Sequence, residues 1–263
     1  MKYFLILLAL MPLALGEDAI RAVIDANDRS ISSQIVDAIE AAKEQMPCGF
    51  PGLGIPPLAP LKISHKEINI DGESIKAHGE INDFRLDGLN DFDVVEFKLS
   101  TILSRVTFKF NWNHVFLTTN YDMATDINML SPHISGLAKF AIKNLQVWGE
   151  AKYSLGILSG NIKLKSFNLY VSVEHVNSEI EGLSKYSIIN KKLNQIIEEW
   201  VYLAINDNTE NISDLTNGYL VPAVNDMIGD MSLSDLLGLI AGGGGSGSGS
   251  ASQGEKEVCV PEN

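Results

Sequence analysis

The sequence has little of what metalloenzymes and nucleotide-binding enzymes need. Only two cysteines and five histidines occur in 263 residues, and no two histidines lie at the spacing of a helical metal site. A phosphate-binding loop ending in Gly-Lys-Ser/Thr and a Gly-x-Ser-x-Gly elbow are both missing. Gly242, Gly244 and Gly247 match a dinucleotide-binding spacing, but they lie in a glycine-serine tract and follow no strand pattern. The sequence therefore predicts no metal site, no cofactor and no catalytic activity; an enzyme would need folding to bring a histidine and a carboxylate together.

Basic residues are scarce as well. There are 20 Lys and Arg against 33 Asp and Glu, which gives a formal net charge of −13 and an isoelectric point near 4.8. A nucleic-acid backbone or an anionic membrane surface repels a chain with this overall charge. The composition therefore argues against a nucleic-acid partner.

Long hydrophobic runs are absent except at the N-terminus. Lys2 precedes an apolar stretch over residues 4–15, and Ala14 and Gly16 place small residues where a signal peptidase cleaves. The stretch is about a dozen residues, short of the about 20 needed to cross a bilayer. These features predict a signal peptide over residues 1–16, secretion to the extracellular space, and no stable membrane insertion.

Secretion allows the two cysteines, Cys48 and Cys259, to form a disulfide. Residues 242–254 are almost entirely glycine and serine, and such a flexible tail reaches roughly 20–25 Å. An intramolecular Cys48–Cys259 bond, a disulfide-linked dimer through Cys259, and free thiols all remain open. The chain thus divides into a signal peptide (1–16), a domain (17–241) and a flexible tail (242–263), with a glycosylation sequon at Asn211.

Apolar spacing predicts two long helices. Between residues 20 and 46, apolar side chains recur mostly every four or seven positions, which marks one stripe of a helix. Four prolines and three glycines between residues 48 and 60 then exclude helix and central strand, so we expect an extended crossing there. Helical spacing returns over residues 186–203, which we expect to pack against the first helix, and shorter helices are expected at 215–228 and 233–240.

Between residues 61 and 182 the apolar period changes to two. Apolar and polar residues alternate at 106–112 and at 145–155, as in strands with one dry face. Phase slips between residues 81 and 84 and between 164 and 167 predict bulges where the sheet bends. We expect a strongly curved antiparallel sheet of about five to seven strands.

Several short motifs carry a resemblance to a known family. The most specific is the crossing Pro51-Gly52-Leu53-Gly54-Ile55-Pro56-Pro57-Leu58 with Pro60-Leu61. Weaker matches are Ala38-Ile39-Glu40, Gly49, Gly88-Leu89, Phe92, Val94, Ile189-Asn190, Leu193-Asn194 and Trp200. On these residues the chain resembles the takeout and juvenile-hormone-binding protein family of secreted insect proteins over about residues 20–230, and more loosely the mite group-seven allergens. It lacks the family's two N-terminal cysteines, and its glycine-serine tail falls outside the family pattern.

The resemblance implies an α+β fold in which a strongly curved antiparallel sheet wraps a long helix and forms an elongated half-barrel with an apolar tunnel. It implies that the tunnel carries a small hydrophobic ligand, such as a juvenile-hormone-like terpenoid, a fatty acid or a related lipid, and that there is no catalytic activity. The alternative function is a secreted structural or interaction protein with a closed core, which assembles through its tail.

Periodicity also selects the side chains that would line such a tunnel. Those on the dry side of the strands and of the second long helix are Phe108, Phe110, Trp112, Val147, Tyr153, Ile197, Trp200 and Val201. Alternation does not separate tunnel lining from solid core. Trp148 lies on the polar side of its strand, where it either covers the sheet beneath a helix or loop or belongs to a binding site.

Overall fold

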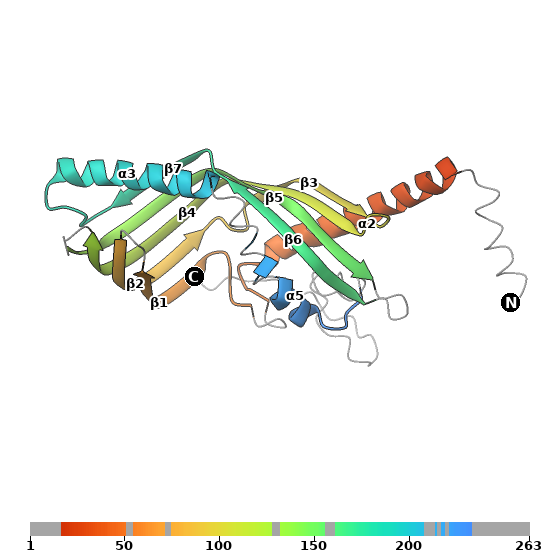
Figure 1. Cartoon of the computed structure of the whole chain (residues 1–263), viewed down its shortest axis with the longest axis horizontal. Coiled ribbons are helices and arrows are strands. Elements are labelled where there is room, and N and C mark those ends of the chain that lie inside the picture. Colours follow the sequence, from red (N-terminus) through yellow and green to blue (C-terminus); the bar gives the residue numbers. More distant parts are fainter. Residues whose placement is uncertain are drawn as a thin grey trace, which may run out of the picture.

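The described part of the chain is a seven-stranded antiparallel sheet flanked by helices (Figure 1). The structure is a computed structural model that describes residues 17–50, 55–71, 75–127, 132–155, 161–207, 214, 217–218 and 221–232. The helices are α2 (Glu17–Gln45), α3 (Ser187–Asn206) and α5 (Val221–Ile228). The strands are β1 (Leu61–Asp71), β2 (Ile75–Asp87), β3 (Phe92–Ser100), β4 (Arg105–Ile127), β5 (His133–Leu155), β6 (Ile162–Ser172) and β7 (His175–Ile180).

Two very long strands form the spine of the sheet. β4 and β5 have 23 residues each and pair with one another along almost their whole length. Each of them pairs with two shorter strands on its outer side. β3 pairs with the first part of β4 and β2 with the rest, whereas β7 pairs with the first part of β5 and β6 with the last part. β1 extends the sheet beyond β2. The result is the elongated, strongly curved half-barrel that the sequence predicts.

The helix and bulge predictions agree with the structure. The first long helix is α2, the second is α3, and α5 lies within the segment expected to hold a shorter helix. Pairing between β2 and β4 shifts register between Asn82 and Arg85, and pairing between β5 and β6 shifts between Lys152 and Tyr153. These shifts lie where the apolar alternation slips phase, because an extra residue in one strand turns the following side chains to the other face. The signal peptide (1–16), the helix expected at 233–240 and the tail (242–263) lie outside the described residues.

The expectation that the two long helices pack against each other is wrong. In the described structure, α2 packs on β3 and α3 packs on β7 and β6. Polar side chains of α2 bind the free edge of β3: Asp28 accepts hydrogen bonds from the Thr101 backbone N–H (3.0 Å) and hydroxyl (2.8 Å), and Ser32 Oγ accepts one from the Leu99 N–H (3.0 Å). Each long helix therefore covers a sheet edge.

Asparagines cover the opposite edge of the sheet. In each case the side-chain Oδ1 accepts from the backbone N–H of one edge residue and Nδ2 donates to its C=O, as a neighbouring strand would. The pairs, at 2.7–3.1 Å, are Asn194 with Ile180, Asn206 with Val173, and Asn225 with Leu164. Unpaired sheet edges invite pairing with other chains. The asparagines therefore satisfy an edge that β6 and β7 would otherwise expose.

The sheltered face of the sheet changes along β4. Near its start the even-numbered Phe108 is buried, with 8% of its surface exposed, whereas farther along the odd-numbered Val115 (3%) and Thr119 (8%) are buried. Successive residues of a strand point to opposite faces. The change from even to odd lies beside Asn144, whose φ is 47° and whose pairing with β4 is missing from the ladder, and it gives one apolar region near α2 and a second near α3.

Candidate functional site

An aromatic cluster occupies the sheltered face near α2. Neighbouring ring centroids lie 4.9–6.3 Å apart, within the range of favourable aromatic pairs. The aromatic cluster consists of Phe92, Phe108, Phe110, Trp112 and Phe167. α2 contributes Lys43, whose Nζ lies 4.8 Å from the centre of the Phe92 ring and donates to the Phe92 carbonyl at 2.6 Å. Cross-strand pairing thus gathers rings that are distant in sequence.

Five of the eight residues predicted to line a tunnel come together at this end. Phe108, Phe110 and Trp112 belong to the aromatic cluster, and Val147 lies directly across from Phe110 on β5. Tyr153 follows on the same face of β5 and is 8% exposed. Alternation identifies these side chains correctly as one face of the sheet.

The other three predicted residues lie on α3, at the opposite end of the molecule (Figure 1). Ile197 and Val201 are half-buried, whereas Trp200 is 67% exposed. At 100° per residue, Trp200 belongs to a stripe along α3 that lies between a third and a half of a turn away from the side that holds Asn194 against β7, with Trp200 nearest to that side. We call Ile189, Ile196, Trp200 and Leu203 the α3 stripe, and all four are exposed. The structure therefore does not bring the two groups of predicted residues together.

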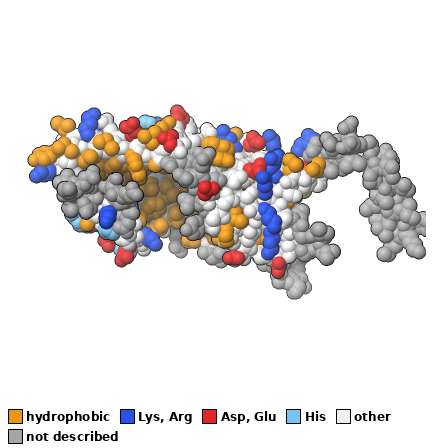
Figure 2. Space-filling model, viewed as in Figure 1, with side chains coloured by type: hydrophobic (Ala, Val, Ile, Leu, Met, Phe, Trp, Pro, Cys, Tyr) orange, Lys and Arg blue, Asp and Glu red, His pale blue; other side chains and the backbone are white. Residues whose placement is uncertain are grey.

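A hollow lined with hydrophobic side chains lies below α3 on the face shown in Figure 2. The half of the sheet toward which β2 extends carries apolar cross-strand pairs: Ile81 lies across from Tyr121, and Met123 lies between Gly79 and Ile134. Ile81, Tyr121, Met123 and Ile134 are half-buried. Among the described residues no large side chain is fully buried. Natural cores are close-packed, so these half-buried apolar side chains are covered less completely than those of a closed core.

Two tyrosines near these walls have raised pKa values. Burial, and then the negative charge of Asp28, raise the pKa of Tyr153, while burial, and then Glu181, raise that of Tyr121. Tyr121 also donates a hydrogen bond to the Glu181 carbonyl at 2.5 Å. Both side chains favour the neutral phenol in the folded state.

We expect the tyrosines to make the fold sensitive to alkali. A raised folded-state pKa contributes stability below the ordinary tyrosine pKa of about 10, and that stability is lost as pH rises through the folded-state value. In an ultraviolet absorbance titration, Tyr153→Phe should remove one of the tyrosines that ionise last. Loss of an early-ionising tyrosine in that variant would contradict the assignment.

Trp148 lines a groove on the polar face of the sheet. The groove has a volume of about 400 Å³, and the Trp148 ring stacks beside Tyr170 with their centres 5.9 Å apart. Thr107, Lys109 and Asn168 also line it. Trp148 alternates along β5 with Val147 and Gly149, which lie across from Phe110 and Phe108, so it does not belong to the aromatic cluster.

Sequence reasoning missed the asparagines that hold α3 in place. Asn194 is 8% exposed, and its side chain also accepts from the Ser178 hydroxyl at 2.9 Å. Asn190, one turn earlier, donates to the Ile180 carbonyl at 2.8 Å. Asparagine is a weak helix former because its side chain competes for backbone hydrogen bonds. The sequence signal for this role was therefore the pair Asn190 and Asn194, two asparagines four residues apart within a helical pattern.

Other predicted features fall partly outside the described residues. Cys48 is not a free thiol, whereas Cys259 and Asn211 are not described, so their pairing and glycosylation stay predictions. Within the described ranges, no group of His, Cys, Asp and Glu side chains is arranged to hold a metal ion. No described helix is both long and apolar enough to cross a membrane.

Comparisons with known proteins give one family and many solved structures, including the following two. A family model described as haemolymph juvenile hormone binding protein matches residues 5–238. The crystal structure of Takeout 1 from Epiphyas postvittana is similar with a TM-score of 0.49 and 12% identity, covering 79% of this chain and 90% of that one. A crystal structure of lipopolysaccharide binding protein gives a TM-score of 0.33 and 10% identity, over 73% of this chain and 39% of that one. No curated protein sequence matches.

Proposed function

The chain belongs to the haemolymph juvenile hormone binding protein family, and on that basis we propose that it is a secreted carrier that encloses a small hydrophobic molecule. The ligand class is a juvenile-hormone-like terpenoid, a fatty acid or a related lipid. The proposed mechanism is burial without a catalytic step. In this proposal residues 1–16 are a signal peptide, 17–241 bind the ligand, and 242–263 are a flexible tail.

The unfilled interior is the observation that carries the proposal. The apolar walls around the hollow are half-buried, and no large described side chain is fully buried. A solid core of this size would leave such side chains in close contact with one another. This favours a carrier over the alternative of an interaction protein with a closed core.

The α3 stripe supplies a further apolar wall. Its members are 43–67% exposed, and leaving large apolar side chains in water is unfavourable by about 25 cal/mol per Å². A ligand of about 15 carbons that covers them gains about 0.8 kcal/mol per buried CH₂, enough for micromolar binding after the entropic cost of association. We therefore place the ligand in the hollow below α3, with Trp200, the member of the α3 stripe nearest to the sheet, at its rim.

Dye displacement tests the proposal. Anilinonaphthalene sulfonate should fluoresce on binding the purified protein, and oleic acid or farnesol should displace it at a stoichiometry of one ligand per chain. A protein that binds the dye but releases it to neither competitor would contradict the proposed ligand class. A protein that binds no dye at all would favour the closed core.

The same preparation tests the cysteines, for which we propose an intramolecular Cys48–Cys259 bond. The support is that Cys48 is not a free thiol and that the chain has one other cysteine. The oxidised protein should run as a monomer on electrophoresis without reductant and should not react with iodoacetamide after unfolding. A dimer that reductant converts to monomer, or alkylation of both cysteines, would contradict this pairing.

A further inference from the structure

The turn between β3 and β4 has an unusual composition for its position. It reads Thr101-Ile102-Leu103-Ser104, and the two aliphatic side chains at its apex are 60% and 57% exposed. Tight turns usually hold glycine, asparagine, aspartate, proline or serine, because these residues suit the backbone and the solvent. We call Ile102 and Leu103 the apolar tip. Nothing in the described fold covers it.

The apolar tip is held in a fixed position. The Ser104 N–H donates to the Thr101 carbonyl at 3.2 Å and closes the turn. Asp28 of α2, 6% exposed, accepts from both the N–H and the hydroxyl of Thr101. A buried carboxylate that binds two donors anchors the turn to the helix. Ile102 and Leu103 are therefore presented to solvent by a rigid support.

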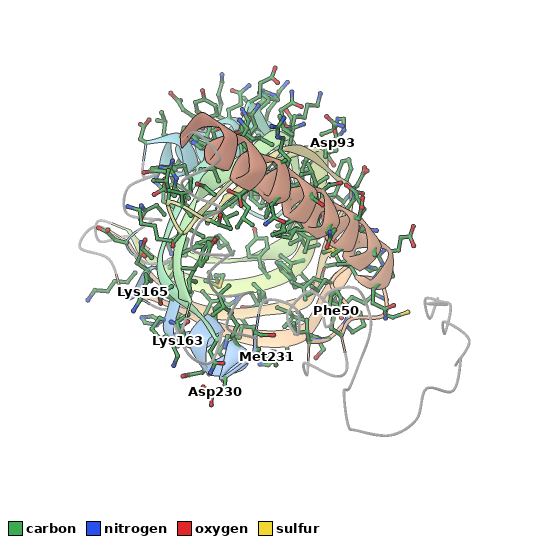
Figure 3. All side chains as sticks on the ribbon, turned by 90° about the vertical axis from the view of Figure 1, so that its right-hand side faces the viewer. Phe50, Asp93, Lys163, Lys165, Asp230 and Met231 are labelled. Atoms are coloured by element: carbon green, nitrogen blue, oxygen red, sulfur yellow. The ribbon has the colours of Figure 1, made fainter. Side chains whose placement is uncertain are left out.

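Basic side chains cross the sheet just behind the tip. Figure 2 shows them as a band of Lys and Arg near the ends of β5 and β6. Arg105 lies directly across from Lys152, and Lys163 lies across from Ser154 in the next row. We define the basic band as Lys98, Arg105, Lys152, Lys163 and Lys165. Figure 3 looks at this end of the molecule, and Lys163 and Lys165 lie at its periphery.

The basic band has a net positive charge in a strongly acidic protein. Two acidic residues share its face: Glu150 lies 2.9 Å from Arg105 and 3.4 Å from Lys152, and Glu96 lies 3.0 Å from Lys98. Five positive charges thus stand against two negative ones, in a chain whose net charge is −13. Like charges directly across two strands destabilise a sheet. Glu150, which lies close to both Arg105 and Lys152, offsets part of this repulsion and leaves the basic band with a net positive charge.

We propose that the apolar tip and the basic band together dock this end of the protein on an anionic lipid surface. Aliphatic side chains that project beyond a row of lysines match the layers of a bilayer surface, with apolar groups in the acyl boundary and ammonium groups at the phosphates. The net charge of −13 opposes approach of the protein to an anionic surface in other orientations. Because salt screens charges that are more than about 8 Å apart, the basic band determines the electrostatic interaction once this end of the protein is close to the surface. Such docking would let a carrier exchange an apolar ligand with a membrane, although the docking itself does not require the ligand.

Vesicle sedimentation tests the proposal on the secreted, full-length chain. We expect binding to phosphatidylcholine vesicles that contain phosphatidylserine to exceed binding to phosphatidylcholine alone by about tenfold or more, and to weaken as salt is raised. Combining Ile102→Ser with Leu103→Ser, or Lys152→Gln with Lys163→Gln, should each weaken binding to the anionic vesicles by about tenfold. Melting curves of the variants should match that of the wild type, because all four side chains are exposed.

A matched control lies at the opposite end of the molecule. Ile188, at the start of α3, is 79% exposed, and Ile188→Ser should leave vesicle binding unchanged. Equal binding to both vesicle types, or an equal loss in the Ile188 variant, would overturn the proposal. If the tip variants instead shift the sedimenting mass of the vesicle-free protein, the tip joins two copies and the proposal is wrong. Dye displacement in vesicle-free solution should be the same in the tip variants and the wild type, which separates this proposal from that of ligand carriage.

Discussion

Replacing Asn194 with leucine should lower the free energy of unfolding by about 1–3 kcal/mol, because a buried polar group left without a partner costs about that much. The substitution keeps the size of the side chain but removes its bonds to the N–H and C=O of Ile180 and to the Ser178 hydroxyl. Asn190 still donates to the Ile180 carbonyl, so the Ile180 N–H is the group left without a partner. Urea denaturation followed by circular dichroism measures the effect.

An exposed asparagine supplies the control for this substitution. Asn27 lies on α2 and is exposed, and Asn27→Leu should change the free energy of unfolding by less than about 0.5 kcal/mol. If Asn194→Leu were equally mild, the asparagines would not be what protects the edge of β7. The account of how the helices hold the sheet edges would then be wrong.

Replacing Trp200 with alanine should weaken ligand binding by about 10–100-fold while barely changing stability. A tryptophan that a ligand covers contributes about 1.5–3 kcal/mol, which corresponds to that range of affinity. Because Trp200 is 67% exposed in the protein without ligand, its removal leaves no cavity in the core. Dye displacement by oleic acid and farnesol, combined with a urea melt, separates the two effects.

Tyr202 is the matched control for Trp200. It is an aromatic residue of the same helix, 39% exposed, and helical spacing places it on the opposite flank from the α3 stripe. Tyr202→Ala should leave ligand affinity within about twofold of the wild type. Equal losses in the two variants would show that the α3 stripe is not a wall of the binding site.

Local periodicity predicted the long helices and parts of the longest strands. Apolar steps of four and seven identified α2 and α3, and alternation identified segments of β4 and β5, whereas β3 and β7 were not identified. The phase slips near residue 82 and near residue 165 predicted two of the three register shifts in the described sheet, since a single extra residue exchanges the faces of a strand; the third, between Val94 and Glu96, was not predicted. The crossing motif pointed to the family that the family model matches.

How the helices and strands pack against one another could not be predicted from periodicity. The full length of β4 was hidden, because its sheltered side chains change from even-numbered Phe108 to odd-numbered Val115 and no single alternation runs through it. Apolar spacing also identifies the side of a helix that is buried, but it does not identify the element that packs against that side. For that reason Trp112 and Trp200 were placed in one lining, although Trp112 belongs to the aromatic cluster and Trp200 is an exposed residue of α3. The partners of α2 and α3 are sheet edges, and polar side chains such as Asp28 and Asn194 recognise them, which a search for apolar stripes does not detect.

The central claim is that the protein holds a hydrophobic molecule in an unfilled interior. Native mass spectrometry of protein purified from a secreting host, followed by solvent extraction of any released molecule, tests it most directly. The account predicts one apolar lipid or terpenoid per chain, either already present or taken up when fatty acids and terpenoids are added. A clean mass of the protein alone, unchanged after both additions, would contradict it.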